Sequence, residues 1–263
     1  MWEKTKGFLA VTAQDARAGE GLGVPCVCLY YRIGEKGTLQ RAQLPLSGRG
    51  GLLGIYDGGG LAAAQPERLA RDLQSECARW GFGGVVLDFS PPEEGLSRLE
   101  ALCGALSRMQ VRYFLSEGLA AWGGEDAPVI VPAAVSGGSF AQVLEALCSR
   151  WGAQRLCVDL VRACSDFPMP TYDPDGTALS PEAFRRLQET YQPQSFFSDR
   201  LCCKYFTYRR QNGSAHFVLF DDAQTAARKL SLICEAGIGH VFLLYSEWGR
   251  EAGELLAGQP PRR

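Results

Sequence analysis

This chain of 263 residues has few histidines, few methionines and a net charge close to zero. It has 2 histidines and 3 methionines, and Lys+Arg 27 against Asp+Glu 29 gives a net charge of −2. Without a basic stripe, neither nucleic acid nor an anionic membrane surface is expected as the main partner. No apolar run approaches the roughly 20 residues that cross a bilayer. The sequence does not identify a protein partner.

Metal-ligand spacing is also missing. The histidines, His216 and His240, stand far from one another, and the 10 cysteines form no ligand pattern. Neither Cys26-Val27-Cys28 nor the adjacent pair Cys202-Cys203 has metal-ligand spacing. We therefore predict no metal, no cofactor and reduced structural thiols. The N-terminus has no signal-peptide h-region, which predicts a cytoplasmic protein.

What the chain does have is a short apolar strand that ends in an acid. Val85 to Phe89 is apolar except for Asp88, with glycine before it and Ser90-Pro91-Pro92 after it. Helix-like segments at 66–80 and 92–110 flank it. A strand that is apolar on both faces between two helices is typical of a parallel sheet covered by helices. Asp88 stands near its carboxyl end, where such folds keep their chemistry.

Seven further runs have the same strand-like character, and several are followed by helical periodicity. Eight parallel strands with mostly helical crossovers predict an α/β fold, a (β/α)8 TIM barrel, with residues 1–263 as a single domain. The first, second and fifth crossovers are short or non-helical. We found no internal repeat and no dividing linker. The eight predicted strands are 8–12, 24–31, 51–56, 85–89, 111–115, 128–132, 156–160 and 240–245.

Two stretches make the chain resemble the chitinase-like family 18 glycoside hydrolases, in particular the bacterial branch that acts on spore cortex and other peptidoglycan. The first is the Gly81-Phe82 entry into the fourth strand, where the family carries Asp-x-x-Asp-x-Asp-x-Glu. The second runs from a predicted hairpin, 205–220, into a helix capped by Asp222, with Lys229 inside it. The third strand with its Gly58-Gly59 ending is also similar.

The resemblance implies a substrate-assisted reaction, in which the motif glutamate donates a proton and the aspartate before it orients the acetamido group of an N-acetylglucosamine-type glycan. Gly83, Val86, Asp88 and Ser90 fall on the four acidic positions of the motif. Asp88 therefore fits the orienting role, but a serine hydroxyl does not donate a proton as a carboxyl with a raised pKa does. The tyrosine and aspartate of the family's sixth strand and the tryptophan of its last strand are also replaced.

Other polar side chains at strand ends and on loops are candidates for the site. Glu117, after the fifth strand, is the best candidate for a relocated acid. Asp88 itself is either a site carboxylate or a buried aspartate that caps a neighbouring loop. Structural roles at the barrel rim are the alternative for the loop residues as well. The candidates for substrate binding are Tyr56, Asp57, Ser136, Asp166, Tyr172, Tyr245 and Glu247.

Three functional hypotheses follow from these residues. The first is a catalytically impaired family 18-like barrel, a pseudoenzyme, that binds an amino-sugar glycan or a related small ligand. The second is an active glycosidase whose acid has moved, with Glu117 as the candidate. The third is a structural or partner-binding barrel without a ligand. A second carboxyl about 5–9 Å from Asp88 would favour catalysis, because two-carboxylate glycosidases space their acids in that range.

Overall fold

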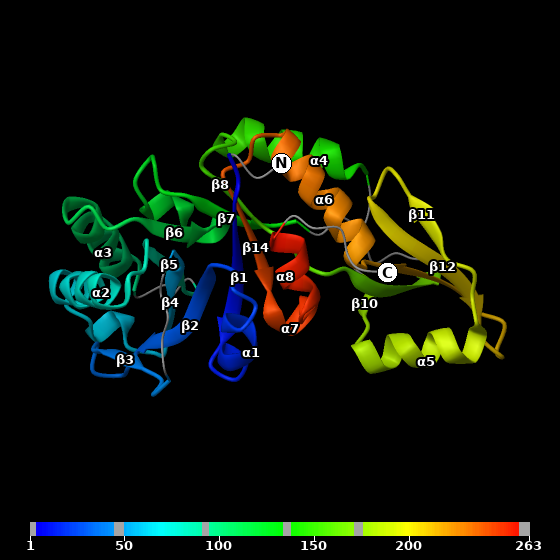
Figure 1. The fold of residues 1–263 in the computed structure, drawn as a ribbon, viewed down its shortest axis with the longest axis horizontal. Coiled ribbons are helices and arrows are strands. Elements are labelled where there is room, and N and C mark those ends of the chain that lie inside the picture. The colour runs from blue at the N-terminus through cyan, green and yellow to red at the C-terminus, as the bar shows by residue number, and fades with distance from the viewer. Residues whose placement is uncertain (1–3, 45–49, 91–94, 134–137, 171–175, 258–263) are drawn as a thin grey trace.

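A computed structural model describes residues 4–44, 50–90, 95–133, 138–170 and 176–257. Eight parallel strands close into a ring, because β1 pairs with both β14 and β2 (Figure 1). The prediction of a (β/α)8 barrel is confirmed, and each strand lies within a few residues of its expected range. The strands of the ring are β1 (Lys6–Thr12), β2 (Cys26–Ile33), β4 (Leu52–Asp57), β5 (Val85–Asp88), β6 (Tyr113–Ser116), β7 (Val129–Pro132), β8 (Leu156–Asp159) and β14 (His240–Leu244).

The crossovers that lack strong helical periodicity are the reduced ones. The first holds only α1 (Ala16–Glu20), the second holds the antiparallel strand β3 (Leu39–Arg41), and the fifth holds the 3-10 helix η2 (Glu117–Trp122). A second 3-10 helix, η1 (Leu61–Ala63), follows β4. Longer amphipathic helices cover the remaining strands. These are α2 (Pro66–Trp80), α3 (Leu96–Arg108), α4 (Phe140–Trp151) and α6 (Ala223–Glu235), with the short helices α7 (Tyr245–Trp248) and α8 (Glu251–Leu256) after β14.

Strand alternation divides the apolar side chains into two layers. A large cluster packs the outer face of the barrel against the helices and includes Leu87 of β5 and Val158 of β8. A smaller cluster fills the barrel interior. Its buried members are Phe8, Ala10, Val27, Leu52, Val86, Phe114, Cys157 and Phe242. The barrel is thus packed through its middle, and chemistry is left to its open ends.

A second, antiparallel sheet is inserted between β8 and α6 and lies beside the barrel in Figure 1. The predicted hairpin forms its centre, as β12 (Cys203–Arg209) and β13 (Ala215–Phe220). One face packs against helix α5 (Pro181–Tyr191), whose N-cap Ser180 accepts a hydrogen bond from the Ala183 N–H. The outer strands are β9 (Cys164–Met169), β10 (Thr177–Ala178) and β11 (Phe196–Ser198).

Residues 165–176, rich in proline, tyrosine and aspartate, are predicted from the sequence to form a loop, and this prediction is wrong for the first part. β9 pairs with β13 along six residues, so Asp166 and Phe167 are buried in the second sheet. The proline at 168 hid the strand, because proline removes a ladder donor and is confined to special positions of sheets.

Candidate functional site

Asp88 lies at the barrel mouth, the end of the barrel formed by the carboxyl ends of the eight strands. Val86 belongs to the interior cluster, and Asp88 is two residues further along β5, so its side chain lies on the same, inner face. The residue is open to solvent at this end. The protein around its carboxyl nevertheless raises the pKa of Asp88 by desolvation. Asp88 is therefore an accessible carboxyl aimed at the mouth.

Asp159 at the end of β8 has the same relation to its strand, although it is not among the site residues predicted from the sequence. Cys157 lies inside the barrel, so Asp159, two residues later, also points to the mouth. Burial raises the pKa of Asp159 to about 6, with further contributions from the charges of Glu247 and Asp88. The signal was present in Leu156-Cys157-Val158-Asp159, an apolar strand closed by an acid like Val85 to Asp88.

Glu247 comes to the same region from helix α7, directly after the last barrel strand. Its carboxylate accepts a hydrogen bond from the backbone N–H of Arg162 at 2.9 Å. In return the Arg162 guanidinium donates to the Glu247 carbonyl oxygen at 3.0 Å and forms an ion pair with Glu251 at 3.3 Å. These contacts fix Glu247 at the rim, close enough for its charge to act on Asp159. The mouth therefore brings together three carboxyls from three elements.

Tyr56 lies next to Asp88, whereas Asp57 has a different task. In the parallel pairing of β4 with β5, Tyr56 stands opposite Asp88, and its side chain is 43% exposed. It is thus available to a ligand at the mouth. The carboxylate of Asp57 accepts backbone N–H groups of residues 59–61 at 3.0, 2.9 and 3.1 Å. Asp57 therefore caps the turn after β4 and holds the strand end in place.

Ser90, Glu117 and Tyr245 are not gathered into one constellation. Ser90 is exposed, two residues beyond Asp88 and just past the end of β5. Glu117 begins η2, and its carboxylate forms an ion pair at 2.6 Å with Arg150 of α4, a helix on the outside of the barrel. Tyr245 packs against the outer apolar cluster. The structure gives Glu117 and Tyr245 partners outside the mouth.

Asp166 belongs to the second sheet and not to the mouth. Its carboxylate contacts His216 Nδ1 at 3.0 Å and accepts the Tyr208 hydroxyl at 2.8 Å. The other ring nitrogen of His216 lies 3.2 Å from the Ser214 hydroxyl, which donates to the Asn212 side chain at 2.8 Å. In this network the serine proton points to Asn212 and away from the imidazole, unlike that of an activated nucleophile. This hydrogen-bond network stabilises the β12–β13 hairpin.

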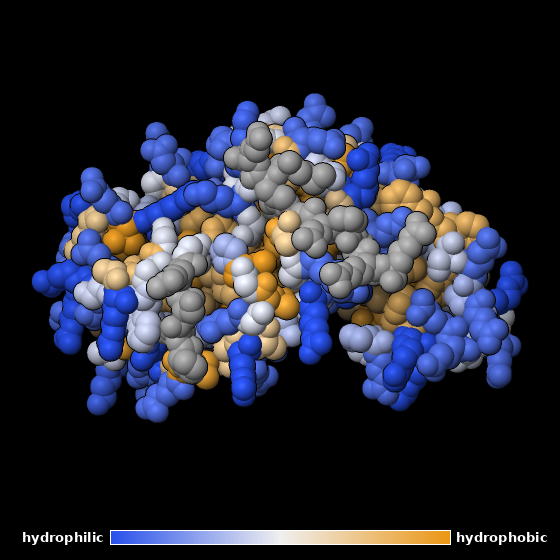
Figure 2. Space-filling model, viewed as in Figure 1, coloured by the Kyte–Doolittle hydropathy of each residue, from blue (hydrophilic) through white to orange (hydrophobic). Residues whose placement is uncertain are grey.

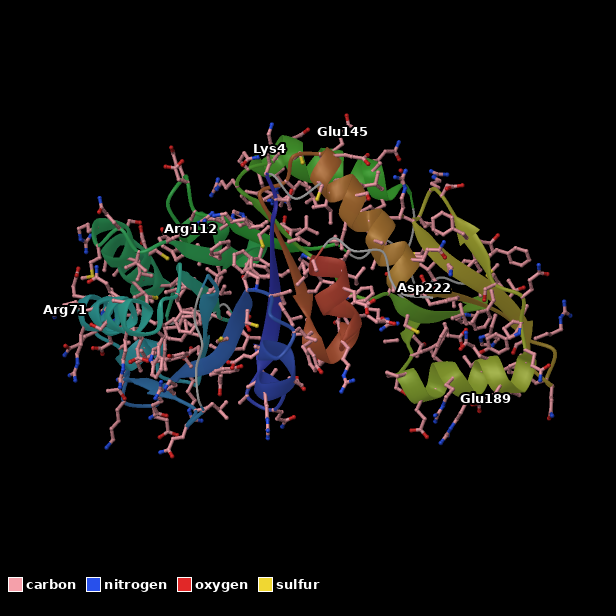
Figure 3. The ribbon with its side chains drawn as sticks, in the orientation of Figure 1. Lys4, Arg71, Arg112, Glu145, Glu189 and Asp222 are labelled. Carbon is pink, nitrogen blue, oxygen red and sulfur yellow. The ribbon has the colours of Figure 1, made fainter. Side chains whose placement is uncertain are left out.

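Arg112 and His240 meet at the opposite end of the barrel. Arg112, labelled in Figure 3, contacts His240 Nε2 at 2.7 Å, and both lie at the amino-terminal ends of their strands. Burial, followed by the positive charge of Arg112, lowers the pKa of His240 to about 4. A neutral, buried histidine under an aromatic layer acts as packing. The other end, the mouth, holds the carboxyls of Asp88, Asp159 and Glu247.

Ser136 and Tyr172 lie outside the described residues. Among those that are described, no group of three or more His, Cys, Asp or Glu side chains is arranged to hold a metal ion. No helix in that part of the chain is long and apolar enough to cross a membrane.

Comparison with solved structures identifies the architecture. The spore cortex-lytic enzyme SleL of Bacillus megaterium superposes with a TM-score of 0.67 at 15% identity, covering 98% of this chain and 75% of that one. A chitinase from Chromobacterium violaceum gives 0.64 at 14%, with 98% and 99% covered. A family 18 chitinase from Cycas revoluta, in complex with (GlcNAc)3, gives 0.63 at 13%, with 95% and 97% covered. The fold is that of the family 18 chitinases.

No protein-family model matches the chain, and no curated protein matches it either. The family 18 fold is therefore established by structure alone. In chain order β5 is the fourth strand of the ring, and Asp88 is its last residue. Active sites of such barrels lie at the carboxyl ends of the strands, which is the end that holds Asp88, Asp159 and Glu247.

Proposed function

We propose that the barrel mouth binds an amino-sugar glycan of the N-acetylglucosamine type and does not carry out the ordinary family 18 hydrolysis. The observation that carries the proposal is the fourth strand, where Asp88 faces the mouth beside Tyr56 while an exposed serine follows two residues later. A carboxylate and an exposed aromatic ring suit the hydroxyl and amide groups and the apolar face of a sugar. The Cycas revoluta chitinase with the same fold was crystallised with (GlcNAc)3.

Titration calorimetry with the trisaccharide of N-acetylglucosamine tests this function. We expect wild type to bind it, and Asp88→Ala to weaken binding at least tenfold, because a hydrogen bond to a charged group is worth about 1.5–3 kcal/mol. Asp126→Asn is the matched control, since Asp126 is an exposed acid just before β7, at the opposite end of the barrel. Absence of binding by wild type would favour the third hypothesis, a structural or partner-binding barrel. The predicted cytoplasmic location and bacterial source belong to the same proposal.

A second candidate function, a glycosidase with a relocated acid, is favoured by Asp159 more than by Glu117. The pKa of Asp159, raised to about 6 by burial and by its acidic neighbours, suits a group that must hold a proton near neutral pH. Glu117 is bound to Arg150 instead. An aryl glycoside of N-acetylglucosamine separates the two functions. Turnover by wild type that is lost in Asp159→Asn would establish the enzyme, whereas silence of wild type supports the binding function.

A further inference from the structure

Arg32 of β2 stands beside Tyr56 at the barrel mouth, and it is not among the site residues predicted from the sequence. The pairing of β2 with β4 places Arg32 opposite Tyr56, and the pairing of β4 with β5 places Tyr56 opposite Asp88. Side chains at paired positions of neighbouring strands lie on the same face of a sheet, so Arg32 faces the mouth as Asp88 does. A guanidinium, an aromatic ring and a carboxyl therefore form a row across three strands.

A β-bulge in β2 gives Arg32 this direction. At the start of the two strands Val27 pairs with Leu52, but the register then shifts by one residue, and Arg32 pairs with Tyr56. Without that shift, Tyr31 would stand beside Tyr56 and the side chain of Arg32 would lie on the other face of the sheet. Bulges of this kind are common next to active sites, where they redirect a side chain. The bulge is thus a structural feature that brings a cation to the mouth.

The side chain of Arg32 is exposed, and its polar head has one protein partner. Its Nε donates to the side-chain oxygen of Gln40 at 3.0 Å. Within the described residues Arg32 forms no ion pair, so its charge and its terminal amino groups are available to a ligand. Arg162, next to the second sheet, is engaged instead. Its guanidinium donates to the carbonyl oxygens of Asp221 and Glu247 at 3.4 and 3.0 Å.

A cavity of about 230 Å³ lies along this part of the mouth. It is lined by Tyr30, Arg32, Gln40, Arg41, Ala42 and Tyr56. Arg41 is engaged elsewhere, because its guanidinium stacks on the ring of Trp80 at 5.0 Å. Figure 2 shows mainly hydrophilic side chains over the lower left part of the molecule, where Figure 1 places β3. The cavity is therefore a polar site in which Arg32 supplies the available charge.

The row from Arg32 to Asp88 suits a glycan that carries a negative charge. The two residues are two strands apart, so their backbones are separated by about 10 Å, and the exposed ring of Tyr56 lies between them. A planar guanidinium matches a carboxylate, to which it can donate two parallel hydrogen bonds. We propose that Arg32 binds a carboxylate carried by the amino-sugar glycan, so that the mouth prefers an acidic glycan to a neutral one. This inference rests on the proposed function of the mouth.

Titration calorimetry on the full chain compares N-acetylglucosamine with N-acetylmuramic acid, the same sugar with a carboxylate-bearing lactyl group on its O3 oxygen. We expect wild type to bind the acidic sugar about tenfold more tightly, because hydrogen bonds between charged groups are among the strongest. Arg32→Gln should bind both sugars equally, and added salt should reduce the preference of wild type. Arg71→Gln is the matched control. Arg71, labelled in Figure 3, is an exposed arginine of α2 whose Nε donates to the Glu67 carbonyl oxygen at 3.2 Å.

A second pair of ligands shows which sugar carries the carboxylate. The disaccharide of N-acetylglucosamine with glucuronic acid has it on the neighbouring sugar, and the neutral disaccharide of N-acetylglucosamine is its reference. A preference for N-acetylmuramic acid assigns the carboxylate to the sugar held at Asp88. A preference for the acidic disaccharide alone assigns it to the next sugar. Either preference supports the inference only if Arg32→Gln removes it.

The outcomes separate this inference from the proposed function. Equal affinity of wild type for the acidic and the neutral member of both pairs overturns the carboxylate site, and so does a preference that survives in Arg32→Gln. Binding of the neutral sugars that depends on Asp88 would then leave the proposed function intact. If none of the sugars binds, both proposals fall. Thermal melts of Arg32→Gln and Arg71→Gln should match that of wild type, because both side chains are exposed.

Discussion

At the scale of the single residue, Asp159 is a carboxyl of the mouth whose pKa changes on folding. Its pKa is raised to about 6 in the folded chain, mainly by burial and then by Glu247 and Asp88. A carboxyl whose folded pKa lies above its unfolded value favours the folded state at low pH. That contribution is complete below about pH 4 and is lost as the pH rises through 6. Asp159 therefore destabilises the folded chain at neutral pH.

Asp159→Asn should remove this penalty. We expect the free energy of unfolding to rise by about 1–3 kcal/mol at pH 7.5 and to change little at pH 4, because each pKa unit corresponds to about 1.4 kcal/mol. Urea unfolding at both pH values measures it. Glu117→Gln is the control, since Glu117 is paired with Arg150 and no comparable gain is expected there. A gain of equal size at both pH values would assign the effect to packing and not to titration.

Ser90→Glu places a carboxyl at the position where the family 18 motif carries its proton-donating glutamate. Ser90 is exposed two residues after Asp88, so a glutamate there should reach the mouth on the same side. A positioned general acid is worth about 10²–10⁴-fold, so weak cleavage of an activated aryl glycoside of N-acetylglucosamine is expected where wild type is silent. Ser90→Gln, which has the shape without the proton, is the control. Efficient cleavage by wild type, unchanged in Ser90→Glu, would contradict the impaired-site hypothesis.

The candidate residues show what the sequence can predict about a site. Asp88 was found because an acid at the end of an apolar strand has a fixed place in a barrel. Asp57 and Asp166 are also aspartates within strands, but their oxygens accept hydrogen bonds from a turn and from a hairpin network. Whether an aspartate is available to a ligand or has a structural role depends on its hydrogen-bond partners, which are distant in sequence. Only the folded chain brings those partners together.

At the scale of the element, a buried ion pair holds the second sheet on the barrel. Lys229 of α6 donates to Asp221 at 2.7 Å, and both side chains are 0% exposed. Asp221 also accepts the backbone N–H of Ala163 at 3.0 Å and the Thr225 hydroxyl at 2.8 Å. The pair thus joins both ends of the inserted segment to the helix. The cap predicted at Asp222, labelled in Figure 3, begins that same helix and is confirmed.

Lys229→Met should cost about 3–5 kcal/mol of unfolding free energy, because it leaves the Asp221 carboxylate buried without its cation. Lys204→Met is the matched control. Lys204 pairs with Asp222 at 2.5 Å, but the two side chains are 25% and 34% exposed, so about 1 kcal/mol or less is expected. Urea unfolding measures both, and adding Asp221→Asn to Lys229→Met should restore part of the loss. Equal costs for the two lysines would show that the buried pair contributes no more than a surface pair.

The elements themselves were predictable where local signals agree. Helix α6 was placed from sequence, because its N-cap Asp222 marks where it begins. The outer strands of the second sheet were not, since β9 carries a proline and β11 has exposed phenylalanines on both faces. β9 is held by its pairing with β13, whose residues lie 46 (Met169 to Ala215) to 56 (Cys164 to Phe220) positions further along the chain. Pairing at that distance leaves no local pattern.

At the scale of the whole molecule, the reactivity of the cysteine thiols shows whether each of the two sheets is folded. All 10 are free, with Cys148, Cys164 and Cys234 half-buried and the others buried. Cys157 lies inside the barrel, and Cys203 lies in the second sheet. Neither residue has any exposed surface. Burial raises the pKa of Cys203 to about 12, and that of Cys157 lies far above its ordinary value for the same cause. Neither thiol reacts readily while its sheet is folded.

We propose that residues 1–263 unfold as one domain, because the Asp221–Lys229 pair and Arg162 join the two sheets. The prediction is that the half-buried cysteines react first with a thiol reagent in native buffer, and that all 10 react in denaturant. Cysteine-specific labelling and mass spectrometry over a urea series should find Cys157 and Cys203 becoming reactive at the same urea concentration. Exposure of Cys203 well before Cys157 would mean that the second sheet opens alone and that the chain has two folding units. In Lys229→Met, where the tie between the sheets is broken, we expect that separation to appear.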